Sequence, residues 1–288
     1  MKVQRAPKSC ILFVQLFLFL TLSLSAQDGF VYGDALPDAP ELSVRGEHAL
    51  GVRTLELIHK GQVDILNSKE GNDPLYDRKL TLELWYPAEV PSGIDALVTY
   101  EEVMGTRGDS LRPLVPFSFK GRALRNAKPK TNKGNFPLVI VSHGYVGSRY
   151  LMTYLTENLA SKGYIIVAID NTDSTFNDAA PIHSTLLNRA LDIQFVLDEI
   201  ARLGIEESNV QLSGLIDVDI AGIVGYSMGG YGVLNVAGAG YSDGLGQFFS
   251  GMTGGSSAIS TLLASNPDYM GGKDSRIKAV VAFAPWGM

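Results

Sequence analysis

A short apolar run that ends in a serine between glycines constrains this chain more than any other stretch. Residues 220–224 read Ile-Ala-Gly-Ile-Val, and Gly225-Tyr226-Ser227-Met228-Gly229 follows at once. A buried strand that stops at a glycine, presents one serine and enters a helix through further glycines is the setting of a catalytic serine on a sharp turn. Gly-x-Ser-x-Gly alone can arise by chance in a turn, so the flanking strand and helix decide. We predict that Ser227 is a nucleophile.

The spacing of the motif has a steric and an electrostatic reason. Side chains two positions before and after Ser227 would collide with the neighbouring strand and helix, which accounts for Gly225 and Gly229. The same turn places the amide of Met228 at a helix N-terminus. Free N–H groups and the positive end of the helix dipole stabilise an oxyanion there. The motif therefore predicts a nucleophile and one half of an oxyanion hole.

The N-terminus has the pattern of a secretory signal peptide. Lys2, Arg5 and Lys8 precede an apolar run over residues 11–20, and small residues follow up to Ala26. We predict that residues 1–26 are cleaved and that the mature protein is secreted or periplasmic. A membrane anchor is the alternative, but the apolar run is shorter than the roughly 20 residues of a spanning helix. After cleavage we expect no membrane span.

Composition and charge limit the partners of the mature chain. With 45% hydrophobic and 19% charged residues, 27–288 can form one large domain. Loss of the three basic residues of the signal takes the formal net charge from −6 to −9, which argues against nucleic acid as a partner. The only cysteine, Cys10, lies in the signal, so we expect no disulfide. Asp170, Asp173 and Asp178 lack the spacing of a calcium loop, and we predict no metal and no cofactor.

The apolar pattern predicts alternating strands and helices. Expected strands cover residues 52–58, 80–86, 137–142, 164–170, 220–226 and 277–283, and expected helices cover 151–161 and 186–203. The first two strands alternate like an antiparallel pair, and the later ones are continuous apolar runs typical of parallel strands covered on both faces. We therefore predict an α/β fold with a mostly parallel sheet and helices on both faces.

Two stretches interrupt this alternation. Residues 90–135 show no sustained period and carry a run of basic residues, so we expect a solvated connection. Residues 239–275 contain Gly-rich turns and a short helix expected near 258–264. The second stretch lies at the carboxyl ends of the strands, where it could form a lid or an acyl pocket, or a purely structural loop.

Four ordered motifs resemble one known family. They are Leu-Trp-Tyr-Pro-Ala at 84–88, Val-Ser-His-Gly-Tyr-Val-Gly-Ser at 141–148, Asp-Ile-Gln-Phe-Val-Leu-Asp at 192–198 and Gly-Tyr-Ser-Met-Gly-Gly at 225–230. Together they resemble the predicted dienelactone-hydrolase-like family of α/β-hydrolases, related to platelet-activating-factor acetylhydrolases and bacterial polyester hydrolases. The resemblance implies that the backbone N–H groups of Tyr145 and Met228 form the oxyanion hole. It also implies a structural role for His143.

The chain departs from the family pattern after Ser227. The triad of this fold runs Ser, then Asp or Glu, then His, yet no histidine follows Ser227. Asp243, Asp268 and Asp274 lie before the last expected strand, and residues 283–286 offer no carboxylate. We expect that the sequence is cut off after the sixth core strand, so that the acid and the histidine lie beyond Met288. The 288-residue chain by itself is then expected to be inactive.

The expected function is cleavage of carboxylic esters by a serine hydrolase that forms an acyl-enzyme. Ser227 would attack the acyl carbonyl, and the Tyr145 and Met228 amides would hold the oxyanion. The expected substrate is a small-molecule ester or a lipid. Two alternatives remain open from the residues alone: a noncatalytic ligand-binding protein of the same fold, or a peptidase on it.

Overall fold

A computed structural model describes residues 31–131, 135–206, 212–269 and 271–287. The strands are β1 (Leu50–Val63), β2 (Leu75–Glu89), β3 (Val98–Met104), β4 (Val115–Gly121), β5 (Leu124–Arg125), β6 (Lys128–Pro129), β7 (Phe136–Ser142), β8 (Ile165–Asp170), β9 (Ile216–Tyr226) and β10 (Ile277–Phe283). The α-helices are α2 (Thr153–Ser161), α3 (Ile182–Ile205), α4 (Met228–Val236) and α5 (Asp243–Met252). The predicted signal peptide and Cys10 lie outside the described residues.

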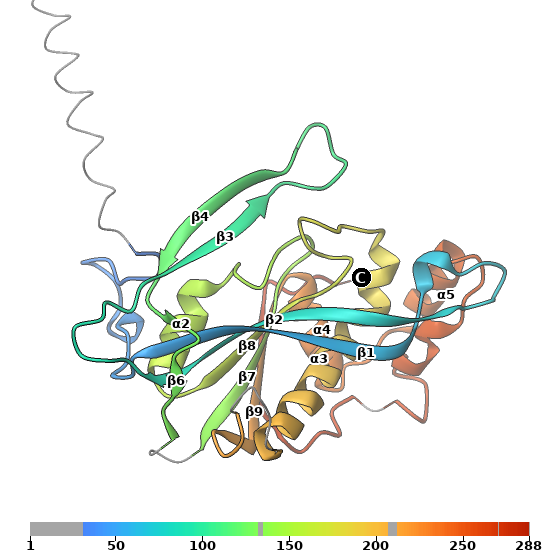
Figure 1. Ribbon diagram of the computed structural model, residues 1–288. Coiled ribbons are helices and arrows are strands. Elements are labelled where there is room, and N and C mark those ends of the chain that lie inside the picture. Colours follow the sequence, from blue (N-terminus) through green and yellow to red (C-terminus); the bar gives the residue numbers. More distant parts are fainter. Residues whose placement is uncertain (1–30, 132–134, 207–211, 270, 288) are drawn as a thin grey trace, which may run out of the picture.

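One mixed sheet forms the centre of the protein (Figure 1). Its strand order is β10-β9-β7-β8-β2-β1-β5, with β6 paired to β2. The strands β8, β7, β9 and β10 are parallel, whereas β2 is antiparallel to both β8 and β1. The predicted antiparallel opening pair is therefore confirmed, and the parallel half carries the crossover helices. The carboxyl ends of β7, β8 and β9 meet at one edge of the sheet.

Helices cover both faces of this sheet, as predicted. Alternate residues of β7 point to opposite faces: Leu138 and Ile140 join one apolar cluster, and Val139 and Val141 join another. The first cluster lies under α3 and α4, and the second lies under α2. Each crossover thus buries an amphipathic helix against a strand that is apolar on both sides. None of the helices in the described ranges is both long enough and apolar enough to cross a membrane.

The stretch from 90 to 135 differs from its prediction as a plain connection. It contains the hairpin β3–β4, a separate two-stranded sheet that projects from the body in Figure 1. The hairpin is attached through Tyr100, whose hydroxyl accepts a hydrogen bond from Trp85 Nε1 at 2.7 Å and donates one to Glu157 at 2.8 Å. Tyr100 and Trp85 are completely buried. The hairpin is therefore anchored to the main sheet at its base.

The stretch from 239 to 275 packs as part of the core. It forms α5 and a 3-10 helix over Ala258–Leu262, which confirms the predicted short helix. Phe249 is fully buried, and the Tyr241 hydroxyl donates to the carbonyl of Leu186 in α3 at 2.6 Å. These residues form an apolar cluster that also contains Met228 of α4. The segment thus supports the start of α3 and of α4 from the side.

Candidate active site

Ser227 stands at the sharp turn between β9 and α4. Its backbone has φ 52° and ψ −115°, a left-handed conformation that a residue with a Cβ rarely adopts. Three backbone hydrogen bonds hold it: its N–H donates to Phe283 O at 2.9 Å, and its carbonyl accepts from the N–H groups of Trp286 at 2.9 Å and Tyr231 at 3.0 Å. The strained backbone expected from the motif is therefore present. The turn leaves the Ser227 side chain partly exposed at the end of the sheet.

The two glycines of the motif are required by close backbone contacts. A Cβ on Gly225 would lie 2.1 Å from Gly229 O, inside the first turn of α4. A Cβ on Gly229 would lie 2.0 Å from Ser142 O and 2.6 Å from His143 O, at the end of β7. Both distances are far below van der Waals contact. Gly225 therefore lets the chain fold back on itself, and Gly229 lets α4 approach the neighbouring strand.

The loop after β7 lies directly against the turn. A Cβ built on Gly144 would be 3.2 Å from Ser227 Cβ and 3.3 Å from the ring of Tyr226. Tyr145 is the next residue, so its amide lies one peptide away from this contact. Among the described residues, no acceptor is hydrogen-bonded to the N–H of Tyr145 or of Met228. The structure thus brings together Ser227 and the loop that contains the second predicted oxyanion donor.

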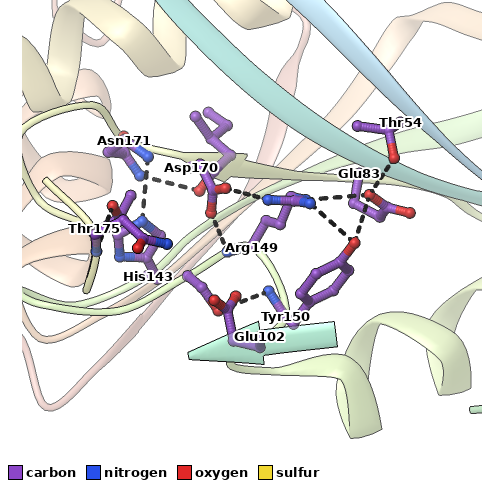
Figure 2. Close-up of polar contacts among 12 residues, drawn as sticks. Thr54, Glu83, Glu102, His143, Arg149, Tyr150, Asp170, Asn171 and Thr175 are labelled. Atoms are coloured by element: carbon purple, nitrogen blue, oxygen red, sulfur yellow. Dashed lines mark hydrogen bonds and ion pairs between the residues drawn. The ribbon is translucent and has the colours of Figure 1, made fainter. Parts of the chain in front are cut away.

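His143 is a buried neutral imidazole. Its Nε2 accepts a hydrogen bond from the N–H of Asn171 at 3.2 Å, so the proton lies on Nδ1, which donates to Gly144 O at 2.6 Å (Figure 2). Burial, together with the positive charge of Arg189, lowers the pKa of His143 to about 3. Both ring nitrogens are used to hold the loop. This agrees with the structural role that the resemblance implies.

The buried state of His143 predicts a loss of stability in mild acid. The unfolded chain takes up a proton near pH 6.5, whereas folded His143 does so near pH 3, so the free energy of unfolding falls as pH falls through that window. Between pH 7 and pH 5 we expect His143 to contribute a loss of about 2 kcal/mol. Urea unfolding of the wild type and of His143→Gln at both pH values measures the difference. Comparing the two proteins removes the opposite contribution of Asp170, whose pKa is raised to about 6 by burial. Equal losses in both would contradict a neutral buried His143.

Arg189 fixes the same loop from α3, and the sequence analysis did not identify it. Its guanidinium is buried and donates to His143 O at 2.6 Å, to Ser142 Oγ at 3.2 Å and to Thr185 Oγ1 at 3.2 Å. Burial lowers the pKa of Arg189 to about 9. A Cβ on Gly232 would lie 2.4 Å from Arg189 Cγ, so a glycine of α4 makes room for it. The available signal was an arginine three residues after Leu186, on the apolar face of the helix.

A second charged network holds the far end of the loop (Figure 2). Asp170, at the end of β8, accepts a hydrogen bond from the Arg149 backbone N–H at 2.6 Å and pairs with its guanidinium. The same guanidinium reaches the buried Glu83 of β2 at 3.2 Å, and the Tyr150 hydroxyl donates to Glu83 at 3.1 Å. The loop between His143 and Arg149 is thus fastened at both ends. Such a loop can present backbone N–H groups in a fixed direction.

The three aspartates considered for a metal serve as hydrogen-bond partners. Asp170 pairs with Arg149, and Asp173 pairs with Arg78 at 2.9 Å. Asp178 accepts the backbone N–H groups of residues 173 and 175. In the described part of the chain, no cluster of three or more histidine, cysteine or carboxylate side chains is placed to hold a metal ion.

Comparisons with known proteins find similarity over the part of the chain that contains this site. A family model described as PET hydrolase-like matches residues 124–242, which include both the loop after β7 and the Ser227 turn. Cutinase est1 of Thermobifida alba is 29% identical over 109 residues, 38% of this chain and 32% of the cutinase. Cutinase cut1 of Thermobifida fusca is 30% identical over 109 residues, 38% of this chain and 30% of the cutinase. Over the matched region the chain is similar to α/β-hydrolases related to the bacterial polyester hydrolases.

The similarity covers only part of this chain and part of each relative. The matched part of the chain spans about a third of the two cutinases. A solved ferulic acid esterase from Streptomyces cinnamoneus has a TM-score of 0.43 and 24% identity, over 64% of this chain and 53% of that one. The residues that match the family model include neither the β3–β4 hairpin, which ends at Gly121, nor β10.

Proposed function

We propose that this protein hydrolyses carboxylic esters and that Ser227 is its nucleophile. The observation that carries the proposal is the strained Ser227 turn with the loop after β7 packed against it, at 3.2 Å between a Cβ on Gly144 and Ser227 Cβ. Backbone strain that the surrounding structure maintains is common at catalytic residues. The match to the PET hydrolase-like family model and the similarity to cutinases support ester hydrolysis as the reaction.

The proposed reaction proceeds through an acyl-enzyme. Ser227 Oγ attacks the carbonyl carbon while a base takes its proton, and the carbonyl oxygen becomes an oxyanion. The N–H groups of Tyr145 and Met228 donate to this oxyanion, and the N-terminal end of α4 adds its positive dipole. The oxyanion then collapses, the ester C–O bond breaks, and the protonated base gives its proton to the leaving alcohol. Water repeats the sequence on the acyl-Ser227 ester and releases the acid.

The base of this reaction is proposed to lie outside residues 1–288, with the acid that orients it. His143 uses both ring nitrogens in the loop, and His59 stacks on Phe195 with centroids 4.0 Å apart. His59 belongs to β1, and three strands separate β1 from β9, a distance of roughly 19 Å across the sheet. His48 contacts Phe136 at the start of β7, the opposite end from the loop. These three positions do not suit proton transfer from Ser227. The fourth histidine, His183 in the first turn of α3, precedes Ser227, whereas the histidine of the triad follows the serine along the chain in this fold.

The setting and substrate class follow the same proposal. A signal peptide at residues 1–26 would direct the protein to the outside of the cell or to the periplasm, where a small-molecule ester or a lipid would be the substrate. The acidic net charge, −9 after cleavage, disfavours binding to nucleic acid. We propose that no cofactor is required, because serine, backbone amides and a base suffice for acyl transfer.

A fluorophosphonate probe tests the proposal directly. The probe forms a covalent bond only with an activated serine, so it should label the complete protein once, and Ser227→Ala should abolish the labelling. Mass spectrometry of the labelled peptide identifies the site. Labelling that survives the substitution would assign the nucleophile to another serine. A complete protein that takes up no probe would instead support the noncatalytic binding protein.

A further inference from the structure

The β3–β4 hairpin reaches back to the site through a chain of backbone hydrogen bonds. The N–H of Arg107, in the turn of the hairpin, donates to Phe176 O at 3.1 Å. Phe176 in turn donates from its N–H to Gly147 O at 3.2 Å, and Gly147 belongs to the loop after β7. The far end of the hairpin is therefore connected to the loop that packs on Ser227, although its base is attached at Tyr100.

An apolar cavity of about 590 Å³ lies between the hairpin and this loop. Met104, Val115 and Phe117 line it from the hairpin, and Val146 and Phe176 line it from the opposite side. Pockets of 300 to 1,000 Å³ lined by apolar side chains are typical of small-molecule sites. Met104, Phe117 and Phe176 also line an adjoining cavity of about 280 Å³. The combined volume of the two cavities is larger than the volume of an acetyl group.

The hairpin side chains of this cavity are exposed. Met104 is 58% exposed, Val115 56% and Phe117 39%. When an apolar group of a ligand covers three such side chains, the burial of apolar surface stabilises the complex. The cavity also lies near Ser227, because its lining residue Val146 follows Tyr145, and a Cβ built on Gly144 would be 3.2 Å from Ser227 Cβ. The Cα atoms of Gly144 and Val146 are at most about 7.6 Å apart.

We propose that this cavity binds the apolar arm of the ester substrate, and that the hairpin makes the protein selective for esters with an arm of about six carbons or more over short ones. The proposal rests on ester hydrolysis at Ser227. It concerns a part of the chain that the family model does not cover, since the hairpin lies before residue 124. Each methylene buried in such a site contributes roughly fourfold to binding.

The test compares two aspartate substitutions on the hairpin of the complete protein. Val115→Asp places a charge in the cavity, whereas Leu111→Asp places one at the hairpin turn, where Leu111 is 91% exposed and lines neither cavity. Two selectivity ratios are measured: kcat/KM for ethyl hexanoate over that for ethyl acetate, and kcat/KM for hexyl acetate over that for ethyl acetate. In Val115→Asp, at least one of the two ratios should fall at least about tenfold. Leu111→Asp should leave both ratios unchanged. Unchanged ratios in Val115→Asp would overturn the assignment of the cavity.

A binding measurement separates this proposal from the proposed reaction. In a Ser227→Ala background, calorimetric titration with p-nitrophenyl hexanoate should give a Kd that Val115→Asp raises at least about tenfold and Leu111→Asp does not change. This result together with no ester turnover by the complete protein would support the cavity and overturn hydrolysis. Turnover together with a Kd that neither substitution changes would support hydrolysis and overturn the cavity. Equal unfolding midpoints of the two aspartate variants confirm that both are folded.

Discussion

Ser227→Ala is expected to lower kcat/KM of the complete protein on p-nitrophenyl acetate by roughly 10⁴-fold to 10⁶-fold. The substitution removes the atom that forms the acyl-enzyme, and the members of a catalytic triad act as a unit. The Tyr145 and Met228 amides would still stabilise an oxyanion. A residual rate roughly 10³-fold to 10⁴-fold above that in water is therefore expected. Initial rates at several substrate concentrations give the comparison.

Ser250→Ala is the matched control for this substitution. Ser250 is also a partly buried serine, but it lies in α5, away from the turn. We expect it to retain the wild-type rate, and the free energy of unfolding of Ser227→Ala to stay within about 1 kcal/mol of the wild type, since alanine changes little but the hydroxyl. A Ser227→Ala protein that keeps more than a tenth of the activity would remove Ser227 from the mechanism.

Gly229→Ala is expected to cause the second largest effect. Alanine is favoured over glycine inside helices by up to about 1 kcal/mol, and Gly229 lies in the first turn of α4. Here the new Cβ would lie 2.0 Å from Ser142 O and 2.6 Å from His143 O. Because both are backbone atoms, α4 or the loop after β7 must move. We expect the free energy of unfolding to fall by about 3 kcal/mol and kcat/KM to fall at least about 100-fold.

Gly251→Ala separates steric contact from helix propensity. Gly251 also lies within a helix, α5, but nothing lies within 4 Å of the position of its Cβ. This substitution should be neutral or slightly stabilising, and it should leave activity unchanged. Urea unfolding and ester turnover of the two variants give both comparisons. A stable and active Gly229→Ala protein would show that α4 does not approach β7 as closely as described.

The long elements could be predicted because their signals are local. The strands over Phe136–Ser142 and Ile165–Asp170 are continuous apolar runs, and α3 shows a helical period over more than four turns. The hairpin was missed because β3 alternates over only seven residues, with Glu101 and Glu102 in the middle. Its stability comes from burial of Tyr100 against Trp85, and nothing near Tyr100 in the sequence indicates that contact.

Only the part of the site that consecutive residues form, the turn at Ser227, could be predicted from the residues themselves. The motif around Ser227 indicated the turn, and the chain after β7 was chosen for the second amide because of a family resemblance. Arg189, which holds that chain in place, is a long-range partner: its guanidinium lies on α3 and its acceptors lie at the end of β7. An arginine on an apolar helix face signals burial, but its acceptors depend on how the helix packs on the sheet.

The two glycines of the motif show where the sequence alone was sufficient. Gly225 is required by a contact with Gly229 O, four residues along the chain, so the local order of residues by itself determined the turn at Ser227. Gly229 is required by the carbonyls at the end of β7, and the apposition of Gly144 to Ser227 depends on the same packing of parallel strands. The apolar cavity depends on the hairpin meeting Val146 and Phe176. Contacts between neighbours in the chain follow from backbone sterics, whereas contacts between distant segments depend on how the whole sheet packs, and only the tertiary structure decides them.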